Sequence, residues 1–257
     1  MKLLFLNLLL AHVIGDFYCQ TWRSRMRIFT HGLNSVDLYV HALIVLVLSW
    51  LVIWSWSFWW AALLMGMIHL LIDASESFVE RSLHVCWHNI HAINYAVWSF
   101  VIDQLLHVAS IAFVAWCWLC YNDWSQFANL QTNWFVVALV LLLCWKPANM
   151  LIGLIYRSYY CPVEVQQQQF NQHYLRFGRF MGTLARWLMV FFISTKLYLG
   201  IGFIVATIAI LHFGGAFGRE RSEYVVIETL LSIAISIACG SLLLALNISM
   251  VPVGFFQ

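Results

Sequence analysis

The chain has 257 residues, of which 63% are hydrophobic and only 9% are charged. A soluble domain is about half apolar and about a quarter charged, so this composition excludes an ordinary soluble protein and is typical of one polytopic membrane domain. The formal net charge is only +2 and no basic stripe is present, which argues against nucleic acid as a partner. The 14 Trp and 19 Phe fit the aromatic belts of a protein embedded in lipid.

Eight stretches approach the roughly 20 apolar residues that a membrane-spanning helix needs. The expected fold class is therefore all-α, a polytopic transmembrane helix bundle of about eight spans. The expected spans are 2–20, 36–54, 58–75, 97–120, 133–156, 180–195, 197–213 and 224–247. The N-terminal stretch lacks a small-x-small cleavage site, so we interpret it as a retained first span rather than a signal peptide.

The segments between these spans are polar and define the expected organisation. A basic loop follows the first span, and residues 76–96 are expected to form an interfacial helix at the membrane surface. The expected domains are a transmembrane bundle that carries the polar clusters, a cytoplasmic polar loop and a group of C-terminal transmembrane helices. Their ranges are 1–156, 157–179 and 180–257. Pro147 removes a backbone donor and is expected to interrupt the fifth span.

Lys and Arg are distributed unequally over the loops. The loops after spans one, three, five and seven together carry nine of these residues, and the opposite side carries two. Because cytoplasmic loops are enriched in Lys and Arg, this distribution places the odd-numbered loops in the cytoplasm and both termini outside.

Four short polar clusters interrupt the first four spans. Three of them are pairs of one imidazole and one carboxylate at i,i+4 spacing, which puts both side chains on one helix face. The fourth is a single histidine. The seven residues are His12, Asp16, His41, His69, Asp73, Asp103 and His107. In the predicted orientation all seven lie in the cytoplasmic half of the bilayer, and we expect them to converge in one cavity.

Ionisable side chains inside a membrane are costly unless they are paired, hydrated or bound to metal. Hydrogen bonds between helices are one explanation, although Asn or Ser would form them at a lower desolvation cost. Imidazole and carboxylate are ligands of zinc, manganese and iron, so all seven residues are candidate ligands of a divalent metal. Asp73 and Asp103 are also candidate catalytic residues. The surplus over the ligands of one zinc could serve a second metal or orient the imidazoles, and a proton or ion pathway is a further alternative.

Several motifs carry a resemblance to a known family. In the first half they are LLLAHVIGDFYCQ, HALIVLVL, HLLIDA and DQLLH, and in the second half KPAN at 146–149, GRFMGTLARWL at 178–188 and EYVVIETLLS at 223–232. With these motifs the chain resembles the bacterial polytopic membrane proteins catalogued as domain of unknown function 3307. It is more loosely similar to bacterial membrane proteins labelled metal-dependent hydrolases. The resemblance implies a multi-pass protein of the bacterial inner membrane with a His/Asp core, and no established reaction.

The sequence favours the hypothesis of a membrane-embedded, metal-dependent hydrolase. Its substrate would be a lipid or another amphiphile that reaches the site from the cytoplasmic leaflet. An ion- or proton-coupled transporter and a non-catalytic membrane scaffold are the alternatives. Membrane lipid is the expected partner, and a homo-oligomer or a soluble cytoplasmic partner stays open. Arg186 is expected to pair with Glu228 or to bind lipid phosphate.

Overall fold

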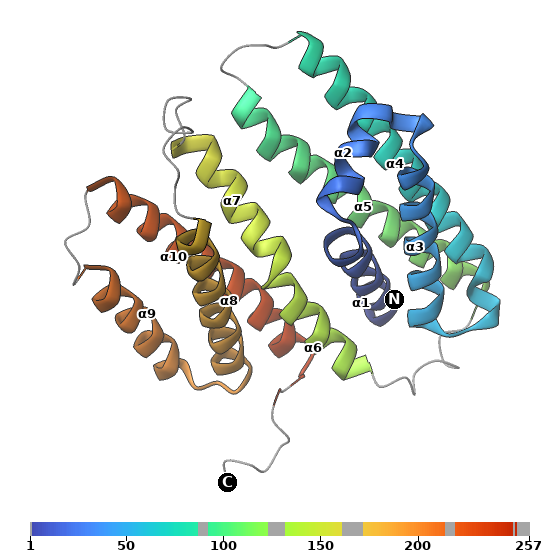
Figure 1. Ribbon diagram of the computed structural model, residues 1–257. Coiled ribbons are helices and arrows are strands. Elements are labelled where there is room, and N and C mark those ends of the chain that lie inside the picture. Colours follow the sequence, from blue (N-terminus) through green and yellow to red (C-terminus); the bar gives the residue numbers. More distant parts are fainter. Residues whose placement is uncertain are drawn as a thin grey trace. The chain divides into compact units, whose positions relative to one another are not determined.

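The computed structural model describes residues 2–86, 92–122, 132–160, 172–213, 219–248 and 250. Every regular element in these ranges is a helix, and no strand occurs among them, which confirms the all-α class (Figure 1). In chain order the elements are α1 (Lys2–Val13), η1 (Ile14–Cys19), α2 (Trp22–His31), η2 (Gly32–Asn34), α3 (Val36–Ile53), η3 (Trp56–Phe58), α4 (Trp59–Cys86), α5 (Ala92–Tyr121), α6 (Thr132–Leu143), α7 (Lys146–Tyr160), α8 (Gln172–Ser194), α9 (Tyr198–Phe213) and α10 (Arg219–Ala245).

Six helical segments of the described chain are long and apolar enough to cross a membrane. They are Lys2–Cys19, Val36–Ile53, Trp56–Ser82, Val97–Tyr121, Asn133–Ile155 and Val226–Ala245. Each matches one of the eight expected spans. The remaining two, 180–195 and 197–213, lie in α8 and α9, and α9 contains a shorter apolar helix at Tyr198–Ile210. By helix length and composition, the protein is a multi-pass membrane protein.

The chain forms two compact units, Met1–Leu139 and Val140–Gln257. In the first unit α3 packs against α1 and α4, and α5 packs against α1 and α4. The border between the units falls inside α6. The polar stretch 157–179 is partly helical, because α7 continues to Tyr160 and α8 begins at Gln172; residues 161–171 lie outside the described ranges.

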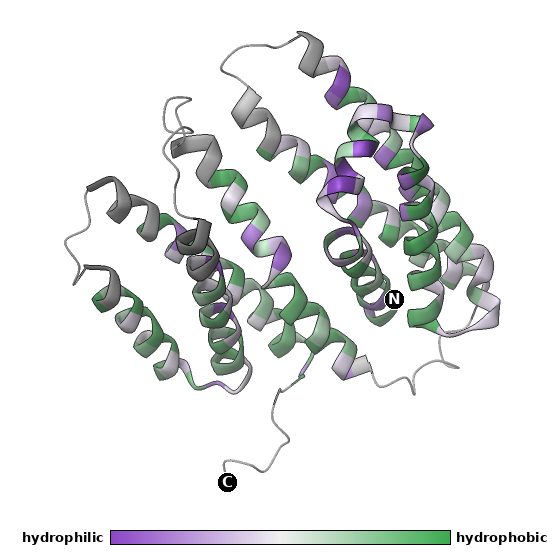
Figure 2. Ribbon diagram, in the orientation of Figure 1, coloured by the Kyte–Doolittle hydropathy of each residue, from purple (hydrophilic) through white to green (hydrophobic). Residues whose placement is uncertain are grey.

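Two polar segments of the first unit differ from what the sequence suggested. The basic stretch after the first span forms α2 instead of a loop, and Thr21 Oγ1 accepts a hydrogen bond from the Ser24 backbone N–H at 3.2 Å, which caps this helix. Helix α4 continues without a break to Cys86, so residues 76–86 prolong the third span rather than form a separate interfacial helix. Residues 87–91 lie outside the described part of the chain. Figure 2 shows hydrophilic residues concentrated on α2, whereas α3 is mainly hydrophobic.

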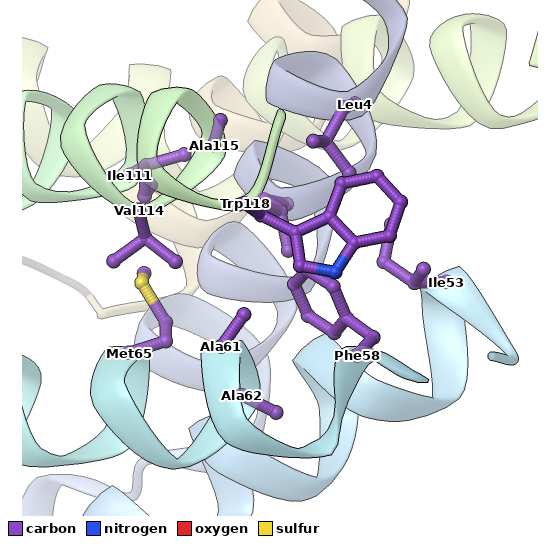
Figure 3. Packing of buried hydrophobic residues seen from close by; sticks show 11 residues of the cluster. Leu4, Ile53, Phe58, Ala61, Ala62, Met65, Ile111, Val114, Ala115 and Trp118 are labelled. Atoms are coloured by element: carbon purple, nitrogen blue, oxygen red, sulfur yellow. The ribbon is translucent and has the colours of Figure 1, made fainter. Parts of the chain in front are cut away.

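An apolar cluster fills the end of the first unit at which α1 begins and α5 ends (Figure 3). Its members are Leu4, Leu8, Ile53, Phe58, Ala61, Ala62, Met65, Ile111, Val114, Ala115 and Trp118. The rings of Phe58 and Trp118 meet edge to face with centroids 5.8 Å apart, a preferred aromatic geometry. Met65 lies one helical turn before His69 on α4. The apolar packing therefore holds the helices in register up to the level at which the polar residues begin.

Two glycines let α3 approach its neighbours closely at that level. A Cβ added to Gly15 would lie 2.8 Å from Cγ2 of Val45, and one added to Gly66 would lie 2.9 Å from Cβ of Leu46. Small residues at helix contacts allow such close packing inside a membrane. Gly15 precedes Asp16 directly, so this close contact also positions one of the polar clusters.

The second unit contains a fully buried arginine on α8. The Arg186 guanidinium donates hydrogen bonds to oxygens of four residues: the carbonyl of Cys144 at 2.8 Å, Ser232 Oγ at 3.0 Å, Thr183 Oγ1 at 3.1 Å and Asn149 Oδ1. These bonds join α8 to α7, α10 and the segment between α6 and α7. A buried charge that is bonded in this way holds helices together in an apolar surrounding.

The interruption expected near Pro147 is confirmed, because α6 ends at Leu143 and α7 begins at Lys146. Carbonyl groups at such a break need donors from elsewhere in the protein. Arg186 supplies one for the Cys144 carbonyl, and Trp187 Nε1 donates to the Leu141 carbonyl at 3.0 Å.

The expected neighbour of Arg186 also lies close to it. A Cβ added to Gly182 would be 3.3 Å from both Arg186 Nη1 and Glu228 Oε1, so the two charged groups approach the same point on α8.

Candidate metal centre

The first unit brings all seven predicted site residues together. His12 comes from α1, Asp16 from η1, His41 from α3, His69 and Asp73 from α4, and Asp103 and His107 from α5. Their side chains are between 0% and 12% exposed. Each imidazole has a nitrogen within 3.6 Å of a carboxylate oxygen from this set. The predicted convergence of the three pairs and the single histidine is thereby confirmed.

Asp16 faces three imidazoles with one oxygen. Its Oδ1 lies 3.4 Å from Nε2 of His41, 3.4 Å from Nε2 of His69 and 3.5 Å from Nδ1 of His12. The Nε2 atoms of His41 and His69 are themselves 3.1 Å apart. One proton shared by these two nitrogens makes a hydrogen bond between them, but Asp16 Oδ1 is then left buried without a hydrogen-bond donor among the described residues. A cation between the three atoms would remove this conflict.

Asp73 turns its two oxygens toward different imidazoles. Oδ2 lies 3.6 Å from Nε2 of His41 and 3.5 Å from Nε2 of His69, while Oδ1 lies 3.3 Å from Nε2 of His107. This carboxylate therefore connects the α3–α4 part of the cluster with the α5 part.

The tautomer of His107 follows from the groups around Nδ1. That nitrogen lies 3.0 Å from the backbone carbonyl oxygen of Asp103 and 3.3 Å from Asp103 Oδ1. A backbone carbonyl oxygen can only accept hydrogen bonds, and so can the oxygen of an ionised carboxylate. Nδ1 therefore carries the proton. In the neutral ring, Nε2 then presents its lone pair toward Asp73. A carboxylate behind an imidazole is the arrangement that orients a metal-binding histidine.

The distances in the cluster fit ligands around a cation better than direct hydrogen bonds. N–H···O hydrogen bonds are about 2.7–3.2 Å long, whereas the imidazole–carboxylate distances here are 3.3–3.6 Å. Two ligands at about 2.1 Å from a tetrahedral zinc lie about 3.4 Å apart. Asp16 Oδ1, Asp73 Oδ2 and His107 Nε2 are buried and accept or donate no hydrogen bond within the described part of the chain. The residues present therefore fit a zinc, manganese or iron ion.

Three overlapping groups have ligand atoms within 4.8 Å of one another. They are His12, Asp16 and His107; Asp16, His41 and His69; and His69, Asp73 and His107. Asp103 belongs to none of these groups among the described residues. It contacts His107 from the side away from Asp73, and its Oδ2 accepts a hydrogen bond from Gln104 Nε2 at 3.0 Å.

A pocket of about 40 Å³ reaches the cluster beside α2. It is lined by Asp16, Phe17, Gln20, Arg25, Ile28, Phe29, His41, Asp73, Glu76, Ser77, Glu80, Phe100, Asp103 and Gln104. A water needs about 10–15 Å³ of such space, so the pocket has room for about three waters. Sequence reasoning did not assign Arg25, Glu76 or Glu80 to the site. Both glutamates follow Asp73 at helical spacings, i+3 and i+7, and this periodicity could have revealed them.

Asp16 lies in a π-helical segment, although the sequence pattern suggests a plain α-helix. The backbone N–H of Gln20 bonds the carbonyl of Gly15 at 3.1 Å, five residues earlier. Such wider turns within helices occur frequently at functional sites. Here the wider turn begins next to the close contact of Gly15 with α3 and carries the carboxylate that faces three imidazoles.

A family model described as protein of unknown function (DUF3307) matches residues 4–145, more than half of the chain. The chain belongs to this family. The DUF3307 match contains all seven His and Asp residues of the cluster and ends before the KPAN motif and the later motifs. No curated protein and no solved structure matches the chain.

Proposed function

We propose that this protein is a membrane-embedded, metal-dependent hydrolase. The observation that supports this most directly is a set of buried imidazole and carboxylate atoms, spaced as cation ligands are, beside a pocket with room for water. A divalent metal with an open position lowers the pKa of bound water and so supplies a hydrolytic nucleophile. A purely structural network would instead pair its buried donors and acceptors, and several atoms of this cluster have no such pairing among the described residues.

The site residues take different roles in this proposal. The four histidines, with Asp16 and Asp73, would hold zinc, manganese or iron. Asp73 and Asp103 both line the pocket, so either carboxylate could accept a proton from a water bound there. Asp103 contacts His107 through Nδ1, so it also positions that imidazole.

The substrate in this proposal is a lipid or another amphiphile from the cytoplasmic leaflet. The pocket adjoins α2, on which Arg27 and the large apolar side chains Trp22 and Met26 are exposed. Basic and apolar groups on one short helix are typical of the membrane interface. A pocket of about 40 Å³ is far smaller than a whole lipid, so only the hydrolysed group would enter it while the apolar chain stays in the bilayer.

Elemental analysis and a lipid assay together test the proposal. Purified full-length protein should contain stoichiometric zinc, manganese or iron, and His69→Ala should lose it. His31→Ala is the matched control, because His31 is an exposed histidine of α2. In vesicles of phosphatidylethanolamine and phosphatidylglycerol, the wild type should release headgroup or fatty acid, and Asp73→Asn should not.

Two results would contradict the enzyme. Wild-type protein without metal, but with proton-dependent uptake into vesicles, would identify a carrier. Wild-type protein with neither metal nor uptake would indicate a scaffold.

A further inference from the structure

We propose that the cluster holds two divalent cations that share the carboxylate of Asp73. This inference rests on the metal site of the proposed function and concerns how many ions that site takes. One zinc binds three or four protein ligands, and six residues contribute to the three overlapping ligand groups. Six ligand residues are too many for one ion, and they lie at two ends of the cluster.

Asp73 is the residue that joins these two ends. Its Oδ2 faces Nε2 of His41 and His69 at 3.6 and 3.5 Å, and its Oδ1 faces Nε2 of His107 at 3.3 Å. An imidazole nitrogen has one lone pair and binds one ion, whereas the two oxygens of a carboxylate can each bind a different ion. The orientation of Asp73 is that of a bridging ligand, with one oxygen directed to each ion, so Asp103 would be the proton acceptor in a site with two ions.

The first ion would lie among Asp16, His41 and His69. These residues form one ligand group, with three N···O or N···N distances of 3.1–3.4 Å. This end of the cluster also contains Asp73 Oδ2, which would complete a four-ligand set.

The second ion would lie between Asp73 Oδ1 and His107, and His12 belongs to a ligand group with His107 and Asp16. The rings of His12 and His107 are stacked with centroids 4.9 Å apart and an interplanar angle of 24°. Both nitrogens of His12 are buried and make no hydrogen bond within the described residues, although this ring is only 1% exposed. His12 is thus a buried imidazole that makes no hydrogen bond in the described part of the chain and stacks on His107. A second ion beside these two rings would explain this arrangement.

Charges and distances together distinguish two ions from one ion accompanied by a protonated His107. The three carboxylates carry three negative charges, so one divalent ion would leave one negative charge uncompensated, whereas two divalent ions with one bound hydroxide would give a neutral site. A protonated His107 between Asp73 and Asp103 could supply the missing charge. Charge-assisted N–H···O bonds are about 2.7–2.9 Å long, but His107 lies 3.3 Å from a carboxylate oxygen on both sides. An ion between Nε2 and Asp73 fits this spacing better than a proton does.

Manganese stoichiometry and electron paramagnetic resonance test the proposal on the full-length protein in detergent. The protein is stripped with a chelator and reloaded with Mn²⁺ alone. The wild type should bind two Mn²⁺ per chain and give the spectrum of an exchange-coupled pair. His107→Ala and His41→Ala should each bind one Mn²⁺ with an uncoupled spectrum, and His31→Ala should match the wild type.

The wild-type spectrum tests the proposal even if a variant fails to fold. One Mn²⁺ per chain in the wild type would overturn the second ion and leave the proposed function standing. No bound Mn²⁺, zinc or iron would overturn both. Two ions without exchange coupling would overturn the sharing of Asp73.

Discussion

The Asp103→Asn variant tests whether the Asp103 carboxylate positions His107 or binds the metal directly. The Asp103 side chain is 5% exposed, and its Oδ1 lies 3.3 Å from Nδ1 of His107. Asn keeps the size of the side chain and removes its charge. The backbone carbonyl of residue 103 still accepts from Nδ1, as it does now at 3.0 Å. The variant ring should therefore keep its tautomer and lose part of its orientation and basicity.

The expected loss in metal affinity follows from this geometry. Removing the carboxylate behind a metal-binding histidine typically weakens affinity by about 10- to 100-fold. Because one of the two acceptors at Nδ1 remains, we expect the lower end, about tenfold, which is about 1.4 kcal/mol. Loss of a direct ligand such as Asp73 should cost considerably more.

Competition with a fluorescent zinc chelator measures this difference on purified Asp103→Asn and wild-type protein at one pH. Asp37→Asn is the control, because Asp37 pairs with Arg27 at 2.7 Å outside the cluster. An affinity within twofold of the wild type would show that Asp103 does not act through His107. Complete loss of metal would show that it is itself a ligand.

Substitutions at three other positions test other parts of the structure. Gly15→Ala should lower the free energy of unfolding by about 1–3 kcal/mol, because its Cβ would overlap Val45; detergent unfolding followed by circular dichroism measures this. Arg186→Met should cost about 3–5 kcal/mol in the same assay, because it leaves several buried hydrogen-bonding groups unpaired, and Arg186→Lys should recover part of that loss. Asp37→Asn should change unfolding by less than about 1 kcal/mol, because it removes only a partly exposed ion pair with Arg27, and should leave bound metal unchanged in elemental analysis.

The residues that form the cluster could be predicted from the sequence because their spacing carries geometric information. An i,i+4 pair lies on one face of any α-helix, and an apolar helix does not leave such a pair facing lipid. The interruption at Pro147 was predictable for a similarly local reason, since proline lacks the backbone donor that a helix interior needs.

Helix α2 and the π-helical turn at Asp16 depend on contacts between segments that are distant in the sequence. Helix α2 is short and basic, and such a helix is marginal alone. In the structure it is stabilised by the Thr21 cap and by contacts with α4, including Arg25 Nη2 at 3.7 Å from Glu76 Oε1. The π-helical turn at Asp16 also has no local signature, because it belongs to the region where Gly15 packs closely against α3.

The apolar cluster around Phe58 and Trp118 affects whether water and ions can cross the membrane through this unit. It occupies the same helices as the His/Asp cluster and lies between that cluster and the end of the unit where α1 begins. Water and ions that enter beside α2 therefore meet closely packed apolar side chains beyond His12. A carrier would have to separate the Phe58 and Trp118 rings and their neighbours in every transport cycle. An enzyme can leave these side chains packed, so it can carry out hydrolysis next to one leaflet without letting ions cross the membrane.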